Sequence, residues 1–175
     1  MANDNRIPVL QLPLERDVFL RGLIHHLAGT LEDVVGIDDA SGFISVVGQR
    51  VGEDLNRQYL NGLNLDSLSR EQVSDVLVDL KRRIKGDFFV IEEDDTKIVL
   101  GNRRCPFEDK VKDRPSMCMM TSNVFGTIAA ENLGYARVEL QETIATGSPQ
   151  CRVSVHLTPT KDTDTQPGIE YYRAE

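Results

Sequence analysis

The fold is decided by residues 104–157, which read RCPFEDKVKDRPSMCMMTSNVFGTIAAENLGYARVELQETIATGSPQCRVSVHL and hold all three cysteines of the 175-residue chain. Cys105 stands before a proline, Cys118 follows after twelve intervening residues, and Cys151 lies near the end. In a cytoplasmic protein, three dispersed cysteines are more typical of metal binding, redox chemistry or plain burial than of a disulfide framework.

A helix and two strands are predicted within this stretch. Pro115 suits the first turn of a helix, and Gly134 is the residue type that ends one. Residues 135–142 and 151–157 then alternate between apolar and polar, which is typical of half-buried strands. The sequence TGSP at 146–149 predicts the turn between them. We therefore expect a C-terminal helix followed by a β-hairpin.

The alternation also predicts which side chains of the hairpin point into the core. Cys151 shares its face with Val153, and Glu142 shares its face with Leu140. If Leu140 pairs with Val153, Glu142 lies directly across from Cys151, with the two Cβ atoms about 5 Å apart. A carboxylate next to a core thiol is costly unless a cation compensates it. This juxtaposition favours a metal ion.

The other two cysteines are placed to join such a site. Cys118 falls in the first turn of the predicted helix, where free N–H groups and the helix dipole stabilise a thiolate. Cys105 precedes a proline, which biases its backbone toward an extended conformation that can project a side chain across a loop. We predict a metal site that holds zinc or an iron–sulfur cluster on Cys105, Cys118, Cys151 and Glu142. The alternative is three ordinary buried cysteines, which pack as small hydrophobes.

The whole chain predicts an α+β fold, with N-terminal helices packed on an antiparallel sheet and the C-terminal helix and hairpin carrying the cysteines. Apolar residues recur at three and four positions in three segments that we expect to be helices, residues 16–35, 38–60 and 69–84. Ser69 and Gln72 resemble a capping box. Residues 87–100 are rich in β-branched and aromatic residues and predict a first hairpin. We assign residues 1–15 to an N-terminal arm, 16–157 to one domain and 158–175 to a disordered tail.

Composition and charge argue against several classes of partner. The net charge of −8 disfavours a nucleic-acid-binding surface, because phosphate contacts need clustered Lys and Arg. The basic cluster at 81–83 lies at the end of a predicted helix, where the helix dipole favours positive charge. No apolar run approaches the roughly 18 residues of a membrane span, and the N-terminus has no targeting pattern. We expect a cytoplasmic protein that binds neither nucleic acid nor membrane.

Motifs for catalysis are missing from the sequence. It has no phosphate-binding loop, no nucleophile elbow and no H-E-x-x-H. A thiol enzyme needs a base near its cysteine, and no histidine lies close to Cys105 or Cys118 in the sequence. We expect a protein that is not an enzyme.

Residues 104–157 resemble the methanogen output domain family, as does the preceding GDFFVIEEDDTKIVL at 86–100, so that the likeness extends over about residues 16–157. The resemblance implies a small domain of bacterial and archaeal signalling proteins, with a fold related to vinyl-reductase-type, TRAPP-like ligand-binding domains. The C-P-F-x10-C opening is similar to SUF-operon-type iron–sulfur repressors, although Asn132 stands where those proteins would carry a further cysteine. Aromatic-sensing activators of the vinyl-reductase type instead hold zinc on three cysteines and a glutamate, a set that the four predicted ligands could reproduce.

These expectations combine into one functional hypothesis. We expect a non-catalytic sensory or regulatory module of a bacterial signalling system, with a three-cysteine zinc or iron–sulfur site. Without a DNA-binding domain of its own, it would signal through a partner such as a histidine kinase or a transcription regulator. The resemblance also implies a homodimer. The alternatives are a metal-free domain that binds an apolar small molecule and, least favoured, a redox enzyme that works through Cys118.

Overall fold

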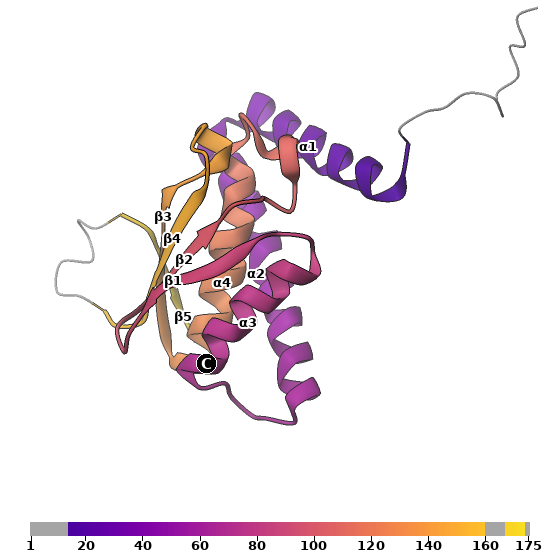
Figure 1. Cartoon of the computed structure of the whole chain (residues 1–175). Coiled ribbons are helices and arrows are strands. Elements are labelled where there is room, and N and C mark those ends of the chain that lie inside the picture. Colours follow the sequence, from indigo (N-terminus) through magenta and orange to yellow (C-terminus); the bar gives the residue numbers. More distant parts are fainter. Residues whose placement is uncertain (1–13, 160–166, 174–175) are drawn as a thin grey trace, which may run out of the picture.

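Five strands form an antiparallel sheet in the order β1-β2-β4-β3-β5 in the computed structural model, which describes residues 14–159 and 167–173 (Figure 1). Leu140 pairs with Val153, which is the register assumed in placing Glu142 opposite Cys151. The α+β class is confirmed, with the C-terminal helix and hairpin in the predicted places. The strands are β1 (Phe88–Glu93), β2 (Lys97–Asn102), β3 (Tyr135–Glu142), β4 (Cys151–His156) and β5 (Ile169–Tyr172).

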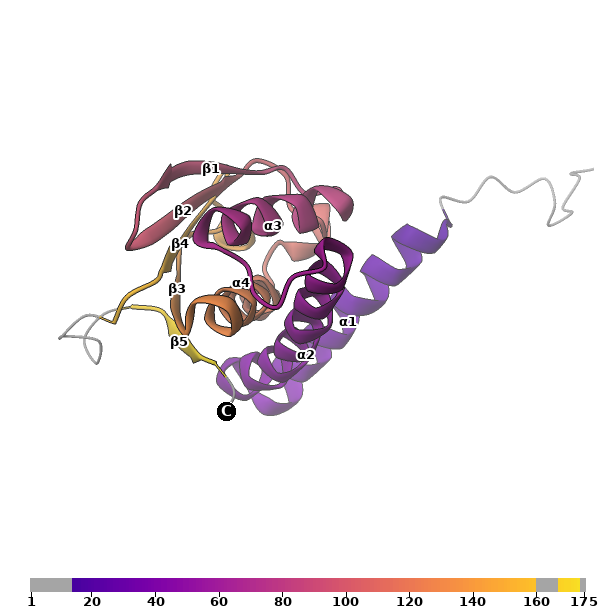
Figure 2. The same ribbon diagram turned by 90° about the horizontal axis from the view of Figure 1, so that it is seen from below.

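The helices all lie on one face of this sheet (Figure 2). They are α1 (Arg16–Val35), α2 (Ile37–Leu63), α3 (Arg70–Arg83) and α4 (Cys118–Leu133), with 3-10 turns η2 (Glu108–Val111), η3 (Pro115–Met117) and η4 (Ile144–Thr146). Helices α3 and α4 pack on the sheet, α2 packs on the outer side of α4, and α1 packs on α2. Within residues 14–159 and 167–173, no helix combines the length and the hydropathy needed to cross a bilayer.

Helix α4 is buried on nearly every side because it lies between the sheet and α2. Its residues Phe125 and Ile128 are fully buried and belong to the main core. On the side of α2, Asn123 donates to the Ser45 hydroxyl at 2.9 Å. Such polar pairs satisfy side chains that a purely apolar interface would leave without partners.

Small residues bring α2 close to α4. A Cβ atom added at Gly52 would lie 2.9 Å from Thr127 Cβ, and one at Gly48 would lie 2.8 Å from Asn123 Cβ. Val47, one of the apolar residues that recur along the helix predicted over residues 38–60, is 50% exposed. The close approach of two helix backbones therefore selects glycine where the apolar pattern indicated larger side chains.

The predicted apolar face of α1 does not meet the core. Ala28 and Gly29 are the buried residues of this helix, which projects past the rest of the structure (Figure 2). The large apolar side chains that recur along it are between 39% and 76% exposed, namely Leu20, Ile24, Leu27 and Val34. Helices α1 and α2 thus carry an uncovered apolar surface.

The C-terminal segment contains a strand that the sequence did not predict. Strand β5 pairs antiparallel with β3. The Tyr171 ring covers Gly126 of α4, and its hydroxyl lies 2.9 Å from the hydroxyl of Ser122. The assignment of residues 158–175 to a disordered tail was therefore wrong for this strand, because four residues are too few for a clear alternation. Residues 1–13 of the predicted arm and 160–166 and 174–175 of the tail lie outside the described residues.

Candidate functional site: a pocket lined by three cysteines

Three segments that are distant in the sequence bring the cysteines to one pocket. Cys105 lies in the loop after β2, Cys118 is the first residue of α4, and Cys151 is the first residue of β4. All three line a cavity of about 30 Å³. The rest of the wall is mainly apolar and consists of Phe88, Asn102, Pro106, Phe107, Val111, Met117, Thr121, Leu140, Thr143, Ile144, Ala145 and Val153.

Cys151 Sγ accepts hydrogen bonds from the Ile144 N–H (3.4 Å) and from Asn102 Nδ2 (3.7 Å). The Thr143 side chain near Cys118 and the backbone N–H groups of Phe107 and Glu108 near Cys105 partly counteract the rise in the pKa of those two thiols. Hydrogen bonds to sulfur favour the thiolate and commonly support thiolate ligands of metals. The surroundings of the sulfurs therefore suit them to the role predicted from the sequence, which stays a prediction.

Glu142 does not join the cysteines. A β-bulge follows Leu140, and Glu142 pairs with Arg152 instead of Cys151. Its side chain is exposed. The prediction that Glu142 faces Cys151 was wrong because a bulge inserts one residue and reverses which side chains face the core. Thr143, the next residue, lines the cavity in its place.

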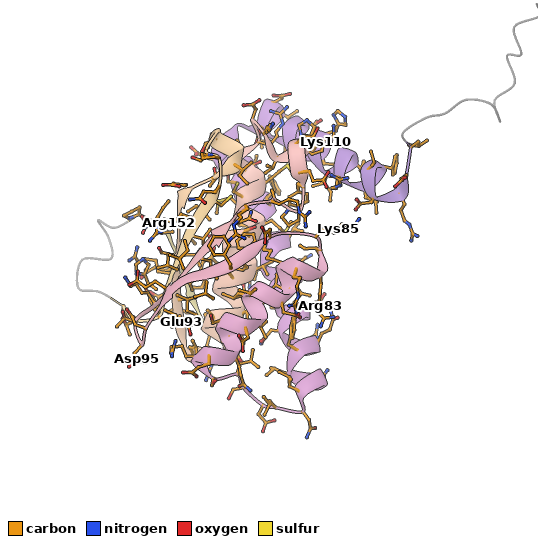
Figure 3. All side chains as sticks on the ribbon, viewed as in Figure 1. Arg83, Lys85, Glu93, Asp95, Lys110 and Arg152 are labelled. Carbon is orange, nitrogen blue, oxygen red and sulfur yellow. The ribbon has the colours of Figure 1, made fainter. Side chains whose placement is uncertain are left out.

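A buried lysine, Lys81 of α3, lies beside the pocket. It is 4% exposed, and its Nζ donates to Thr121 Oγ1 at 2.7 Å. The same Nζ lies 5.2 Å and 5.1 Å from the ring centroids of Phe88 and Phe125. Arg83, two residues on, points outward at the end of the helix (Figure 3). The helix dipole therefore accounts for the exposed part of this basic cluster but not for Lys81.

Burial and proximity shift the pKa values of these groups. Burial lowers the pKa of Lys81 to about 8, and the nearby cysteines partly offset this effect. Burial raises the pKa of Cys118 to about 12, with smaller contributions from Cys151 and Cys105. The pKa of Cys105 is also raised, again mainly by burial. The raised pKa values mean that Cys105 and Cys118 are thiols near neutral pH, so a nucleophilic role and a metal-binding role both require their deprotonation.

The size of the cavity limits what it can hold. Among the described residues, no group of three or more His, Cys, Asp and Glu side chains is arranged to hold a metal ion as it stands. A cavity of about 30 Å³ admits one or two water-sized species, whereas sites for drug-sized ligands measure about 300–1,000 Å³. A single ion fits this space if the thiols turn toward it. A long apolar ligand requires the walls to part.

The loop between Cys105 and Cys118 is fastened to α1 by polar contacts. The His25 ring donates through Nδ1 to the carbonyl oxygen of Lys110 at 2.7 Å, on the part of the loop seen beside α1 in Figure 3. The other contacts are an ion pair of Arg21 with Glu108, a hydrogen bond from Ser116 to Glu32, and an ion pair of Arg114 with Glu32 at 3.4 Å. These contacts hold the cysteine loop against α1, so a movement of one is expected to move the other.

Sequence reasoning missed Lys81 as part of the site, although a signal was present. Lys81 follows Leu77 by four residues and Val73 by eight, and both of those side chains are fully buried. The helical period therefore places the lysine on the apolar face of α3. Thr143 gave no comparable signal, since the bulge that turns it inward is not visible in the alternation.

Residues 23–156 match the family model of methanogen output domain 1. The chain belongs to the methanogen output domain 1 family. The matched range includes all three cysteines and Lys81, and the predicted resemblance is confirmed. Membership of an output-domain family indicates a regulatory role in signalling.

The fold of this methanogen output domain is TRAPP-like. A trafficking protein particle complex subunit 3 from Naegleria fowleri, solved covalently bound to palmitic acid, is similar with a TM-score of 0.57. The two chains are 14% identical, and the alignment covers 81% of this chain and 96% of that chain. At this level of identity the likeness shows the fold alone. Comparison with curated proteins gives no match.

Proposed function

We propose that this methanogen output domain is a non-catalytic regulatory module whose state is set by a soft metal ion at the cysteine pocket. The convergence of Cys105, Cys118 and Cys151 on one small cavity carries the proposal. Thiolates are the preferred ligands of zinc and of iron–sulfur clusters. Three cysteines leave a fourth position for water, a small molecule or a residue of another chain.

A single zinc ion suits the cavity better than a cluster does. The space of about 30 Å³ is close to that of one or two water molecules, and zinc needs only thiolates at about 2.3 Å in a tetrahedral arrangement. Binding requires the thiols to lose their protons, so the apparent affinity should rise with pH. An occupied site would join the cysteine loop, the start of α4 and the start of β4 more firmly.

Metal content and the absorption spectrum of anaerobically purified protein test this proposal. We expect colourless protein with about one zinc per chain, whereas a brown colour identifies an iron–sulfur cluster. Cys105→Ser, Cys118→Ser and Cys151→Ser should each release the metal and lower the melting temperature of the metal-loaded protein. Glu142→Gln is the matched control, because this exposed side chain points away from the pocket and should leave metal binding unchanged.

Two results would contradict the proposal. A metal centre is excluded if wild-type protein stays metal-free after both treatments, anaerobic exposure to zinc and cluster reconstitution. Full metal retention in any one of the serine variants removes that cysteine from the site.

A second candidate function is the binding of an apolar small molecule at the same pocket. The mainly apolar wall and the TRAPP-like fold favour it, and the similar Naegleria fowleri subunit was solved with palmitic acid covalently bound. The small volume argues against it, because an acyl chain needs a much larger opening. An intact-mass measurement under denaturing conditions decides the covalent case, since an acyl adduct on a cysteine adds mass that hydroxylamine removes from a thioester.

We propose that the module passes its signal to a cytoplasmic histidine kinase or transcription regulator. The uncovered apolar side chains of α1 and α2, such as Leu27 (57% exposed) and Phe43 (58% exposed), support a homodimer. Light scattering should then give twice the chain mass of 19.6 kDa. The double variant Leu27→Glu/Phe43→Glu should be monomeric with an unchanged circular dichroism spectrum. A monomeric wild type at micromolar concentration contradicts the homodimer.

A further inference from the structure

Lys81 is a buried cation that has no carboxylate partner among the described residues. It is 4% exposed, and its one hydrogen bond is to the neutral Thr121 hydroxyl at 2.7 Å. Within residues 14–159 and 167–173, no Asp or Glu forms an ion pair with its Nζ. Two of the residues that its Nζ contacts, Thr121 and Phe88, line the cysteine pocket, so the groups that could balance its charge are the three cysteines in their thiolate form.

The neutral contacts of Lys81 compensate its burial only in part. The rings of Phe88 and Phe125 lie 5.2 Å and 5.1 Å from Nζ and contribute weak cation–π attraction. A buried ammonium group is strongly disfavoured unless an anion balances it. Leu77, one turn earlier on the same face of α3, is fully buried, so this face of the helix packs against apolar surroundings.

We propose that the Lys81 ammonium group is the counter-charge of the thiolate-ligated centre, and that it stabilises a centre of one zinc ion and three thiolates, whose net charge is negative. Three thiolates around one divalent ion carry a net charge of −1, which the single positive charge of Lys81 cancels inside a region of low dielectric constant. Lys81 is a positioning residue in this scheme, since it acts on the thiolates and does not ligate the metal. The inference rests on the proposed metal site and deepens it.

The test compares Lys81→Met with Lys112→Met, the same change at an exposed lysine. Zinc affinity is measured by competition with a chromophoric chelator, and the melting temperature is measured with zinc and after chelator treatment. Loss of the counter-charge should weaken zinc binding about 10–100-fold, the usual effect of removing a supporting residue around a metal. The metal-free Lys81→Met protein should melt at the same temperature as metal-free wild type or higher, because an unbalanced buried charge has been removed. Lys112→Met should change neither quantity.

A structural role for Lys81 predicts the opposite pair of results. If metal-free Lys81→Met melts well below wild type and binds zinc with unchanged affinity, the counter-charge assignment is overturned. Lys81→Gln replaces it if the methionine variant does not fold, and Lys81→Arg, which keeps the charge, should bind zinc more tightly than either. Wild type that binds no zinc overturns the metal site itself, so the two failures are distinguishable.

Discussion

The docking of β5 onto α4 makes a prediction whose sign depends on one side chain. A Cβ atom at Gly126 would lie 2.1 Å from the Tyr171 ring, far inside van der Waals contact. Gly126→Ala therefore forces the ring and with it β5 away from α4. Overpacking of this kind costs about 1–3 kcal/mol, while alanine in place of glycine within a helix gains about 1 kcal/mol. We expect a net destabilisation of up to about 2 kcal/mol in the wild-type background.

Removal of the ring should reverse the effect. In Tyr171→Ala protein, nothing of the tyrosine remains to clash, and Gly126→Ala should stabilise by about 0.5–1 kcal/mol through helix propensity. The coupling energy between the two positions is then the overpacking cost itself, about 1–3 kcal/mol. Urea denaturation followed by circular dichroism measures all four proteins of this cycle. Equal destabilisation by Gly126→Ala in both backgrounds would refute the reasoning, because the glycine would then be required by something other than β5.

Three further predictions follow from single sites. The Asn132 side chain accepts from the Leu68 N–H and donates to Asn56 Oδ1, both at 2.7 Å, and Asn132→Ala leaves these two buried groups without their partner. The free energy of unfolding in urea should fall by about 2–4 kcal/mol, and a fall below about 0.5 kcal/mol contradicts the importance of this network. Hydrogen bonds from Arg83 and Tyr59 lower the pKa of Asp79 from 3.8 to about 2, so its contribution to stability is present above pH 3.8 and is lost as the pH falls toward 2. The difference in melting temperature between wild type and Asp79→Asn should therefore shrink over that pH range, and a constant difference contradicts this prediction. Burial raises the pKa of Cys118 to about 12, so iodoacetamide should alkylate this thiol at least about tenfold more slowly in folded metal-free protein than in urea. Peptide mass spectrometry measures both rates, and equal rates would mean that the folded protein holds an accessible thiolate.

Local signals in the sequence predicted most of the elements. The capping box of Ser69 and Gln72 is present at the start of α3, and α1 ends at Gly36 as expected. Strand β3 has the predicted bounds, 135–142. These features depend on backbone chemistry within a few residues, which a single sequence displays directly.

Features that depend on the three-dimensional arrangement were harder to predict. The apolar spacing of α1 predicts burial only where another element covers the helix. Within the described residues, the buried positions of α1 are Ala28 and Gly29, and Gly29 lies against Arg114 of the cysteine loop. The position of Glu142 depended on an uninterrupted strand, and one inserted residue after Leu140 was enough to turn it outward. Lys81 was judged by its charge, although its spacing already placed it on the buried face.

The attachment of the cysteine loop to α1 has a consequence for long-range motion. Helix α1 has 20 residues and is about 30 Å long, and it joins α2 through Gly36, whose φ of 83° and ψ of 166° suit glycine alone. The loop contacts α1 at Arg21, His25 and Glu32, and Lys85 pairs with Asp17 near the N-terminal end of the helix at 3.6 Å, so a movement of the loop and a tilt of α1 about Gly36 have to occur together. A tilt of about 10° around this hinge displaces the N-terminal end of the helix by about 5 Å, given its length. A change at the cysteine loop is thus carried to the exposed apolar side chains of α1 and to whatever molecule rests against them.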